Sequence, residues 1–425
     1  MSVKELPFVS VQADWNKVVE ECSSKTAGDS HSFWLDCYLT GHETVHGKVD
    51  IIVSDGKEAE LKGKEGIDVK AINSRSFILE CDKMNLKDVL VFSPRKEINV
   101  RNGSLTTSVS CVDISPNGKL FVAGCGEQAF LGSMDTGEVQ VTLNGHLSDV
   151  TTVRFFPSNL VVLTGGADFQ LKIWSAINGS NPVTLKGHTG AITGLAIISK
   201  GRNVLSCSRD GTIKLWNCGT SSVINTMGNY KVPINKMLLA KLPREYTPAS
   251  VEDLDPLEVE TADKFVLVAL EDGSAHCIHL GTKQELSASH PKNKTPLTAI
   301  AYDSISNMVA TGNKDGIVEV FESLNSLDKP VLQWKRKAFA ITSLAFKKND
   351  DNIVLCVSSA DGSMYQTGPI NGSSNDDVYV RAEFSGSELE TIHEMKVYND
   401  AGSEQNMDKV QRIVCAVRDG KLKFY

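Results

Sequence analysis

Two groups of residues have the types and spacing of a reactive centre. The first runs from His42 to His46 and reads His-Glu-Thr-Val-His, the pattern in which two histidines on one helical face bind zinc and the glutamate acts as a general base. That chemistry requires a helix. Gly41 and Gly47 flank the segment and two of its residues are β-branched, which favours a loop or hairpin. We find no convincing third ligand, so a zinc hydrolase remains only an alternative that metal analysis would test.

The second group combines a serine, a histidine and an aspartate, which could act as nucleophile, base and orienting group. A matching group with threonine in place of serine occurs 42 residues earlier. A catalytic set is not normally duplicated within a chain, whereas a packing motif is. We therefore interpret both groups, each with a tryptophan, as structural networks: His146, Thr164, Asp168 and Trp174, and then His188, Ser206, Asp210 and Trp216.

The two networks belong to a longer repeat. Lys172-Ile173-Trp174 also recurs 42 residues later, as Lys214-Leu215-Trp216. Four short β-type runs separated by turn residues lie in each repeat. A period of about 40–45 with Gly-His early and Trp late resembles the WD-repeat superfamily, whose repeats are four-stranded blades of a β-propeller. There the aspartate, histidine, hydroxyl and indole bond to one another, so that each buried polar group has a partner.

Asp-Gly pairs mark further blades, because this dipeptide favours a tight hairpin between two strands. With the turns near residues 126 and 168 they predict seven blades within residues 96–425. The chain ends on what corresponds to the third strand of a blade. We expect residues 96–101 to supply the missing fourth strand, because pairing the terminal strands removes the last exposed sheet edge. The Asp-Gly turns are Asp210-Gly211, Asp272-Gly273, Asp315-Gly316, Asp361-Gly362 and Asp419-Gly420.

Residues 1–95 contain no copy of the repeat. A short amphipathic helix is predicted over residues 14–21, and strands over 49–53, 77–81 and 89–92. We expect a small, separate and mostly β domain in front of the propeller. The predicted fold class is therefore all-β, a seven-bladed WD-repeat propeller preceded by this N-terminal domain.

The composition excludes several functional classes. The 425 residues include 44 Lys and Arg against 52 Asp and Glu, a net charge of −8, and lack the concentrated basic face that nucleic acid requires. The longest apolar run, residues 265–270, is far shorter than the roughly 18 residues of a membrane helix, and no secretory signal is recognised. Ten cysteines without a C-x-x-C pair predict neither a disulfide scaffold nor a zinc ribbon. We expect a monomer of the cytoplasm or nucleus that binds proteins and needs no cofactor.

One segment carries most of the negative charge. Residues 244–263 contain seven acidic residues and one arginine, a local charge of −6. Such a segment is either a disordered, solubilising loop or a docking loop for a basic partner. Its position between the first and second strands of the fourth blade places it on the face opposite the Asp-Gly turns.

The second and third repeats carry a more specific resemblance. They contain Gly-Ser-Asn-Pro at 179–182, Gly-Arg-Asn-Val-Leu-Ser at 201–206 and Trp-Asn-Cys-Gly-Thr at 216–220. These motifs resemble the proteasomal ATPase-associated factor family, WD-repeat chaperones that assemble the base of the proteasomal 19S regulatory particle. The resemblance implies a non-enzymatic protein that binds the C-terminal small domain of a proteasomal ATPase subunit through a propeller face. A generic propeller adaptor, such as a ubiquitin-ligase substrate receptor, is the alternative.

The resemblance to WD propellers also implies where a partner binds. Their partner face commonly carries the turns between second and third strands and the loops that enter the first strands, where loops vary while the sheets keep their packing. Placed on this sequence, that face presents six candidate partner-binding residues: Asp149, Arg209, Glu271, Lys314, Phe339 and Arg418.

Overall fold

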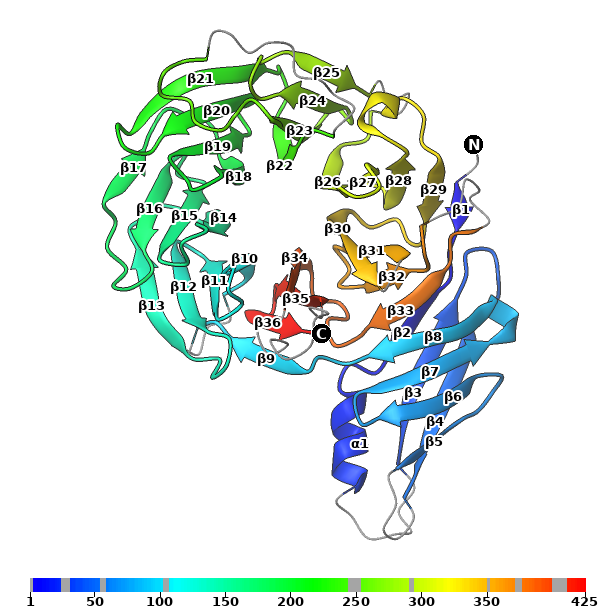
Figure 1. The fold of residues 1–425 in the computed structure, drawn as a ribbon. Helices are drawn as coiled ribbons and strands as arrows, with labels where there is room; N and C mark the ends of the chain where they lie inside the picture. The colour runs from blue at the N-terminus through cyan, green and yellow to red at the C-terminus, as the bar shows by residue number, and fades with distance from the viewer. Residues whose placement is uncertain are drawn as a thin grey trace.

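The computed structural model describes residues 3–23, 31–53, 59–101, 107–243, 254–289, 294–349, 352–370, 377–399 and 411–425. Within these ranges most residues lie in strands, and seven sheets surround a central axis as the blades of a propeller (Figure 1). The predicted all-β class and seven-bladed propeller are thus confirmed. None of the helices in these ranges is long and apolar enough to cross a membrane.

In the first four blades the strands follow one another from the axis to the rim, each antiparallel to the last. Blade one contains β10 (Val109–Ile114), β11 (Leu120–Cys125), β12 (Gln128–Ser133) and β13 (Val139–Asn144). Blade two contains β14 (Val150–Phe155), β15 (Val161–Gly166), β16 (Leu171–Ser175) and β17 (Val183–Leu185). Blade three contains β18 (Ile192–Ile198), β19 (Asn203–Ser208), β20 (Thr212–Asn217) and β21 (Ser222–Asn229). Blade four contains β22 (Ile234–Lys241), β23 (Lys264–Leu270), β24 (Ala275–His279) and β25 (Glu285–Ala288).

Each of the last three blades pairs with a strand that precedes blade one in the chain. Blade five contains β26 (Leu297–Tyr302), β27 (Val309–Asn313), β28 (Ile317–Phe321) and β29 (Leu332–Lys335), with the short helix η2 (Leu324–Ser326) before β29. Blade six contains β30 (Ile341–Asn349), β31 (Asn352–Ser359), β32 (Met364–Thr367) and β33 (Val380–Phe384). Blade seven contains β34 (Ile392–Asn399), β35 (Gln411–Val417), β36 (Lys421–Phe424) and, as its outer strand, β9 (Lys96–Asn99).

The outer strand of blade seven closes the ring. Strand β9 is antiparallel to β36, with Ile98 opposite Leu422, and both side chains are buried with residues of blade one. The backbone N–H of Arg95 donates to the carbonyl of Phe424 at 2.7 Å. The segment just before blade one and the end of the chain therefore share a sheet, which leaves no unpaired edge at this junction.

A β-bulge recurs near the start of every innermost strand. In all seven blades the pairing register shifts across the second residue of the strand. A bulged residue is unpaired in its own sheet, so its side chain is re-aimed. In blades one to five this side chain donates to the carbonyl of the first residue in the next blade's innermost strand, at 2.5–2.8 Å: Ser110, Thr151, Thr193, Asn235 and Thr298. These five residues form the interblade belt.

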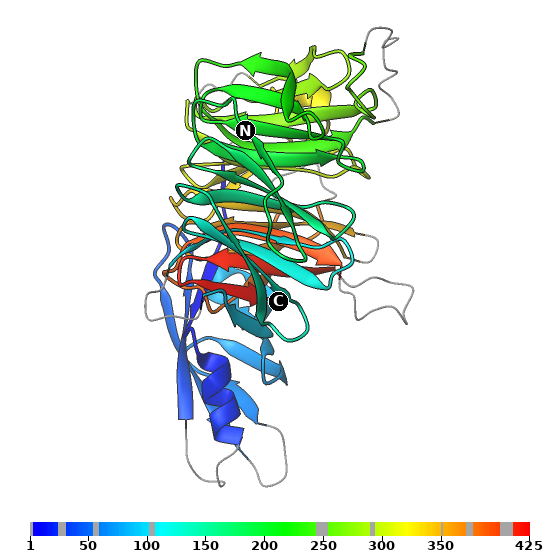
Figure 2. The same cartoon turned by 90° about the vertical axis from the view of Figure 1, so that its left-hand side faces the viewer.

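The N-terminal region is joined to the ring through two shared sheets. Strand β1 (Lys4–Glu5) runs parallel to β29 of blade five, and β8 (Leu86–Phe92) runs parallel to β33 of blade six. Strands β7 (Ser76–Cys81) and β6 (Asp68–Asn73) continue the blade-six sheet outward. A four-stranded sheet of β2 (Phe8–Val11), β3 (His31–Tyr38), β4 (Val45–Ile52) and β5 (Glu60–Gly63) completes the region with helix α1 (Trp15–Ser23) and the short helix η1 (Asp82–Met84). Figure 2 shows this region projecting beyond the rim of the ring. Where a separate domain was expected, two sheets are shared between the region and the ring.

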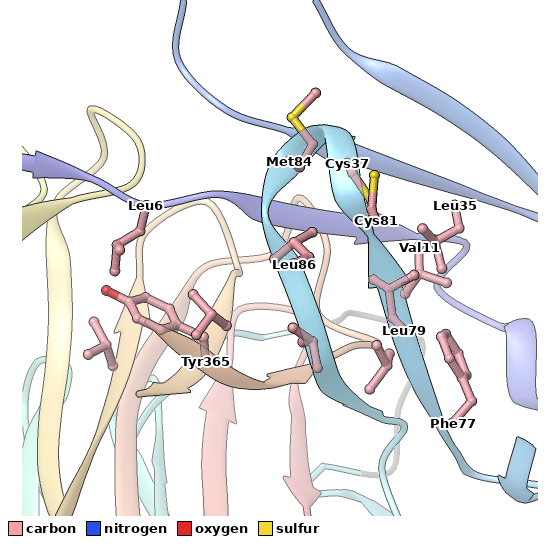
Figure 3. Close-up of a cluster of buried hydrophobic side chains, with 14 of the residues drawn as sticks. Leu6, Val11, Leu35, Cys37, Phe77, Leu79, Cys81, Met84, Leu86 and Tyr365 are labelled. Carbon is pink, nitrogen blue, oxygen red and sulfur yellow. The ribbon is translucent and has the colours of Figure 1, made fainter. Parts of the chain in front are cut away.

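A continuous apolar core crosses from the N-terminal region into blades five and six. Figure 3 shows Leu6, Leu86 and Tyr365 of this core, contributed by the N-terminal segment, β8 and blade six. Trp15 of α1 is fully buried and packs edge-on against Phe77, with ring centroids 4.9 Å apart. Burial of this size on both sides makes the two parts one hydrophobic unit.

A buried ion pair fixes the N-terminal segment between blades five and six. The guanidinium of Arg336 contacts the carboxylate of Glu383, and its Nε donates to the carbonyl of Pro7 at 3.0 Å. Glu383 also accepts the backbone N–H of Val9 at 3.3 Å. The guanidinium lies over the ring of Tyr365, 4.2 Å from its centroid. Each buried charge thus has a partner, as burial requires.

Candidate functional site

In blade two the four predicted network residues meet. Nδ1 of His146 lies 2.9 Å from Oδ2 of Asp168, and Nε2 lies 2.7 Å from Oγ1 of Thr164. The indole N–H of Trp174 donates to the same hydroxyl at 2.8 Å. Asp168 also accepts the backbone N–H of Leu147 at 3.0 Å. The network therefore ties the loop that enters the blade to the turn between its second and third strands.

Blade three repeats this arrangement. Nδ1 of His188 lies 2.8 Å from Oδ2 of Asp210, and Nε2 lies 2.7 Å from Oγ of Ser206. Trp216 donates its indole N–H to that hydroxyl at 2.8 Å, and Asp210 accepts the backbone N–H of Thr189 at 2.9 Å. The two sets superpose bond for bond, as expected for a packing motif.

Burial decides what these groups can do. Thr164 and Ser206 are 0% exposed, and each hydroxyl is already held by an indole N–H, so a substrate cannot reach either oxygen. Burial lowers the pKa of both His146 and His188, although the neighbouring aspartates pull each pKa upward. The histidines are neutral hydrogen-bond bridges at pH 7. We assign both sets to structural packing.

The turns and entry loops held by these networks lie side by side on one face of the ring. Backbone N–H groups at the turns bond to carbonyls of the entry loops, Arg209 to Ala191 and Arg418 to Thr391, both at 2.9 Å. Blades four, five and six make the same bond. We call this surface, formed by the turns between second and third strands and the loops entering first strands, the turn face.

All six predicted partner-binding residues lie on the turn face. Glu271 is half-buried, and its carboxylate accepts a hydrogen bond from the side chain of Asn235 at 2.8 Å, so it is engaged within its own blade. The other five are exposed: Asp149, Arg209, Lys314, Phe339 and Arg418.

Phe169 on the turn face was not predicted, although its sequence position marks it. It follows Asp168, where later turns have glycine after the aspartate, as at Gly211. Its φ of 69° lies in the left-handed region, and its side chain is 43% exposed. A non-glycine residue there costs about 1–2 kcal/mol, and such strain concentrates at functional positions. The comparison of Asp-Phe with Asp-Gly could have identified it from the sequence.

Two further exposed apolar side chains were also missed. Leu147 is 77% exposed and belongs to the loop held by Asp168, beside Phe169. Leu389 is 90% exposed in the loop entering blade seven, and its backbone N–H bonds to the carbonyl of Asp361 in the blade-six turn at 3.1 Å. With Phe339 at 49% exposed, the turn face carries large apolar side chains on both sides of the ring.

The zinc-like segment lies in the N-terminal region, outside the blades, and is not helical. His42 lies in the turn after β3, and its backbone N–H bonds to the carbonyl of Leu39 at 3.0 Å. His46 is already in β4, where Nδ1 lies 3.2 Å from Oδ1 of Asp36. The expected loop-to-strand geometry is thus observed. Across the part of the chain that the structure describes, no three His, Cys, Asp or Glu residues gather as metal ligands would.

The second half of the acidic segment is folded onto the ring. Residues 244–253 lie outside the described residues, but Glu258 is buried against Lys283, with Oε2 2.6 Å from Nζ. The amide side chain of Asn203 donates to the carbonyl of Leu257 at 3.1 Å and accepts the N–H of Val259 at 2.7 Å. Residues 254–263 are therefore an ordered cover over blades three and four, which corrects the expectation of a disordered loop for this part.

Comparison with known proteins agrees with this architecture. The family described as WD domain, G-beta repeat matches residues 95–129, 137–175 and 179–217. Two solved propellers, titled "Structure of U3-55K" and "Crystal structure of RRP9 WD40 repeats", each have a TM-score of 0.57 and 15% identity. Each match covers 76% of this chain, with 91% and 90% of the respective structures. At that identity the likeness concerns the fold alone.

Sequence relatives are more specific. The probable proteasomal ATPase-associated factor 1 of Dictyostelium discoideum is 32% identical over 378 residues, which cover 85% of this chain and 86% of the relative. The human proteasomal ATPase-associated factor 1 is 35% identical over 155 residues, covering 35% of this chain and 36% of the relative. Because the first match covers more than two thirds of both chains at more than 30% identity, the chain belongs to the proteasomal ATPase-associated factor 1 family.

Proposed function

We propose that this chain is a non-enzymatic assembly chaperone of the proteasomal regulatory-particle base. It binds the C-terminal small domain of an ATPase subunit through the turn face and holds the subunit during assembly. The family membership supports the proteasomal partner. The observation that carries the choice of surface is the combination, on one rigid face, of exposed apolar side chains with charges of both signs.

The physical character of the turn face suits a folded protein partner. Exposed aromatic and aliphatic groups, such as Phe169 and Phe339, can serve as buried anchors, and arginines at the rim supply directional hydrogen bonds. The turns are held by the buried networks and by backbone bonds between turn and loop. A pre-organised surface loses little conformational entropy on binding.

The test is a pull-down of the purified chain with each proteasomal ATPase small domain in turn. We expect one subunit to bind with a dissociation constant in the micromolar range or below and the others more weakly. Failure of every small domain to bind would defeat the proposal. Association with a ubiquitin-ligase scaffold instead would support the adaptor alternative.

Two matched variants locate the surface. Phe339→Ala removes an exposed aromatic group on the turn face, whereas Ile305→Ala removes an aliphatic group that is 71% exposed in the turn between β26 and β27, on the opposite face. We expect the first to weaken binding by about tenfold and the second to leave it unchanged. The reverse pattern would move the binding site to the opposite face.

We place this activity in the cytoplasm or nucleus. All ten cysteines are free and nine of them are buried, a pattern typical of proteins that remain in a reducing compartment. Burial raises the pKa of Cys111 and Cys207 to about 12, so these thiols stay protonated and unreactive.

A further inference from the structure

The innermost strands surround a channel of about 600 Å³. Its lining comes from β14, β18, β22, β26, β30 and β34, which Figure 1 shows around the axis. Blades three, five and six contribute small side chains that leave the space open: Gly194, Ala196, Ala299, Ala301, Ser343 and Ala345.

The other lining blades contribute charge. Arg154 of blade two, Lys236 of blade four and Lys396 of blade seven line the channel, against one lining carboxylate, Glu394. The lining charge is therefore 3 − 1 = +2. Asp113 of blade one lies within electrostatic reach of Arg154 and Lys396, and its carboxylate accepts the backbone N–H of Phe155 at 2.8 Å. Counting Asp113 as ionised still leaves one uncompensated positive charge.

Both carboxylate oxygens of Glu394 already have partners within the protein. Oε2 accepts the backbone N–H of Val112 at 3.0 Å, while Oε1 lies 3.4 Å from Nη1 of Arg154 and 3.6 Å from Nζ of Lys396. Burial alone would raise the pKa of Glu394, but the surrounding cations, Lys396 first, lower it to about 2. Glu394 is therefore an ionised carboxylate in direct contact with two cations, while Lys236 influences it through its charge alone.

Lys236 is the third cation. Among the described residues its ammonium makes no ion pair and no hydrogen bond. Figure 1 places β22, which carries Lys236, across the channel from β34, which carries Lys396, with β14 on the side between them. Burial and the positive charges of Arg154 and Lys236 lower the pKa of Lys396, although Glu394 and Asp113 raise it, so the three cations repel one another. The ammonium groups of Lys236 and Lys396, which both line the channel, therefore have donors available for an anion that enters it.

We propose that the central channel binds a small multivalent oxyanion, held by Lys236 on one side and by Arg154 and Lys396 on the other. The chemistry fits phosphate or carboxylate groups, because guanidinium and ammonium donors form charge-assisted hydrogen bonds with both. The bound anion would join blades two, four and seven across the axis. A ligand that binds only the folded ring also stabilises it by mass action. This site is independent of the turn face and of any protein partner.

The test uses the full chain with two anion probes, pyrophosphate and citrate, at constant ionic strength set with sodium chloride. Titration calorimetry should give one site, and the anion should raise the unfolding temperature above that in chloride alone. Binding of pyrophosphate alone identifies phosphorylated ligands, binding of citrate alone identifies polycarboxylates, and binding of both shows that charge alone selects. Each result supports the site, whereas no binding of either anion overturns it.

Lys236→Gln separates binding from folding. This variant removes a charge that repels Lys396 but attracts Glu394, so its unfolding temperature without anion should stay close to that of the wild type, while its affinity for the anion falls by about tenfold or more. The control, Lys241→Gln, changes an exposed lysine at the end of the same strand, outside the channel lining, and should keep the affinity. Unchanged affinity in Lys236→Gln and in the parallel variant Lys396→Gln, or an equal loss in the control, would overturn the proposal.

Discussion

Phe169 combines a strained backbone conformation with an exposed aromatic side chain. In blades three, five and six the glycine at the corresponding turn position lies against backbone of a neighbouring loop, so that an added Cβ at Gly211 would lie 2.0 Å from the carbonyl oxygen of Tyr230. In blade two the same position carries Phe169, an aromatic residue in the left-handed conformation. Such strain concentrates at functional positions, so we expect Phe169 to contribute to the proposed binding surface.

The first prediction is that Phe169→Gly makes the protein more stable and a weaker binder. Relief of the left-handed backbone is partly offset by the greater freedom of glycine in the unfolded chain, which leaves a net gain of about 0.5–1 kcal/mol in the free energy of unfolding. Urea denaturation measures the stability, and the ATPase small-domain pull-down measures the binding. Leu160→Gly, an exposed residue on the opposite face, controls for loss of apolar surface. Unchanged affinity in Phe169→Gly would remove this residue from the binding surface.

His393 predicts a pH dependence. Its Nε2 lies 2.9 Å from Oγ of Ser108, and burial together with the positive charges of Arg418 and Lys236 lowers its pKa. The unfolded chain therefore binds a proton more readily than the folded one, so stability present above about pH 6.5 is lost as the pH falls toward the lowered pKa.

His393→Gln keeps a side chain able to bond to Ser108 but removes the titration. Between pH 6.5 and 5.5, its free energy of unfolding should fall less steeply than that of the wild type, by up to about 1.4 kcal/mol per pH unit. Denaturant unfolding at several pH values measures both slopes. Parallel slopes would show that this histidine titrates alike in the folded and unfolded chains.

At the residue scale, the sequence was sufficient where a side chain has a repeated partner. The histidine, aspartate, hydroxyl and tryptophan of blades two and three stand 42 residues apart and bond as two copies of one network. Phe169 could also have been recognised, by its place after Asp168. The lack of a hydrogen-bond partner for Lys236 among the described residues could not be predicted, because it depends on which side chains of blades two and seven line the same channel.

At the scale of the element, the interblade belt explains how four-stranded sheets hold together around an open axis. Thr193 illustrates it, because its Oγ1 donates to the carbonyl of Ile234 in the next blade at 2.6 Å. Thr193→Val keeps the shape and the β-branched character of the side chain but leaves that carbonyl without its donor. We expect a loss of about 1–2 kcal/mol in the free energy of unfolding, measured by urea denaturation.

The control for the belt is Thr220→Val. Thr220 is exposed in the turn before β21, and its hydroxyl bonds only to that of Ser222 at 2.8 Å among the described residues. This change should alter stability by less than about 0.5 kcal/mol. Equal losses of unfolding free energy in the two variants would indicate that the hydrogen bond between blades does not stabilise the ring more than a surface hydrogen bond does.

The belt has a sequence signal that is weaker than the turn signal. Each innermost strand begins with an aliphatic residue followed by a polar one, as in Val150-Thr151 and Ile234-Asn235. Because the second residue varies between serine, threonine, asparagine and histidine, the pattern becomes clear only when the strand starts are aligned by blade. The bulge that redirects this side chain has no characteristic residue type here, so it could not be predicted from the sequence.

At the scale of the whole molecule, the N-terminal region and the ring support each other. Strand β8 covers the edge of β33, and Tyr365 and Ile370 of blade six lie in the core shared with Leu86. Residues 96–425 alone would expose that edge and this apolar surface. We predict that the truncated chain associates on size exclusion and binds the dye ANS, whereas the full chain does neither. A monomeric truncated ring with unchanged stability would show that the region is dispensable.

The joining of the N-terminal region to the ring could not be predicted from the sequence. The pairing of Leu90 with Ala382 joins residues 292 positions apart in the chain, and parallel pairing at an outer edge imposes no local pattern on either strand. The strands themselves were predictable from their apolar alternation, as for residues 77–81 within β7. What could not be inferred was that they extend a blade instead of closing a separate domain.

The central claim is that the turn face of one rigid ring holds the ATPase subunit. Lysine cross-linking of the complex, read by mass spectrometry, tests it most directly because exposed lysines occur on both faces. The account predicts cross-links to the partner from Lys231 and Lys314 on the turn face and none from Lys119 and Lys200 on the opposite face. Cross-links from Lys119 and Lys200 alone would contradict it.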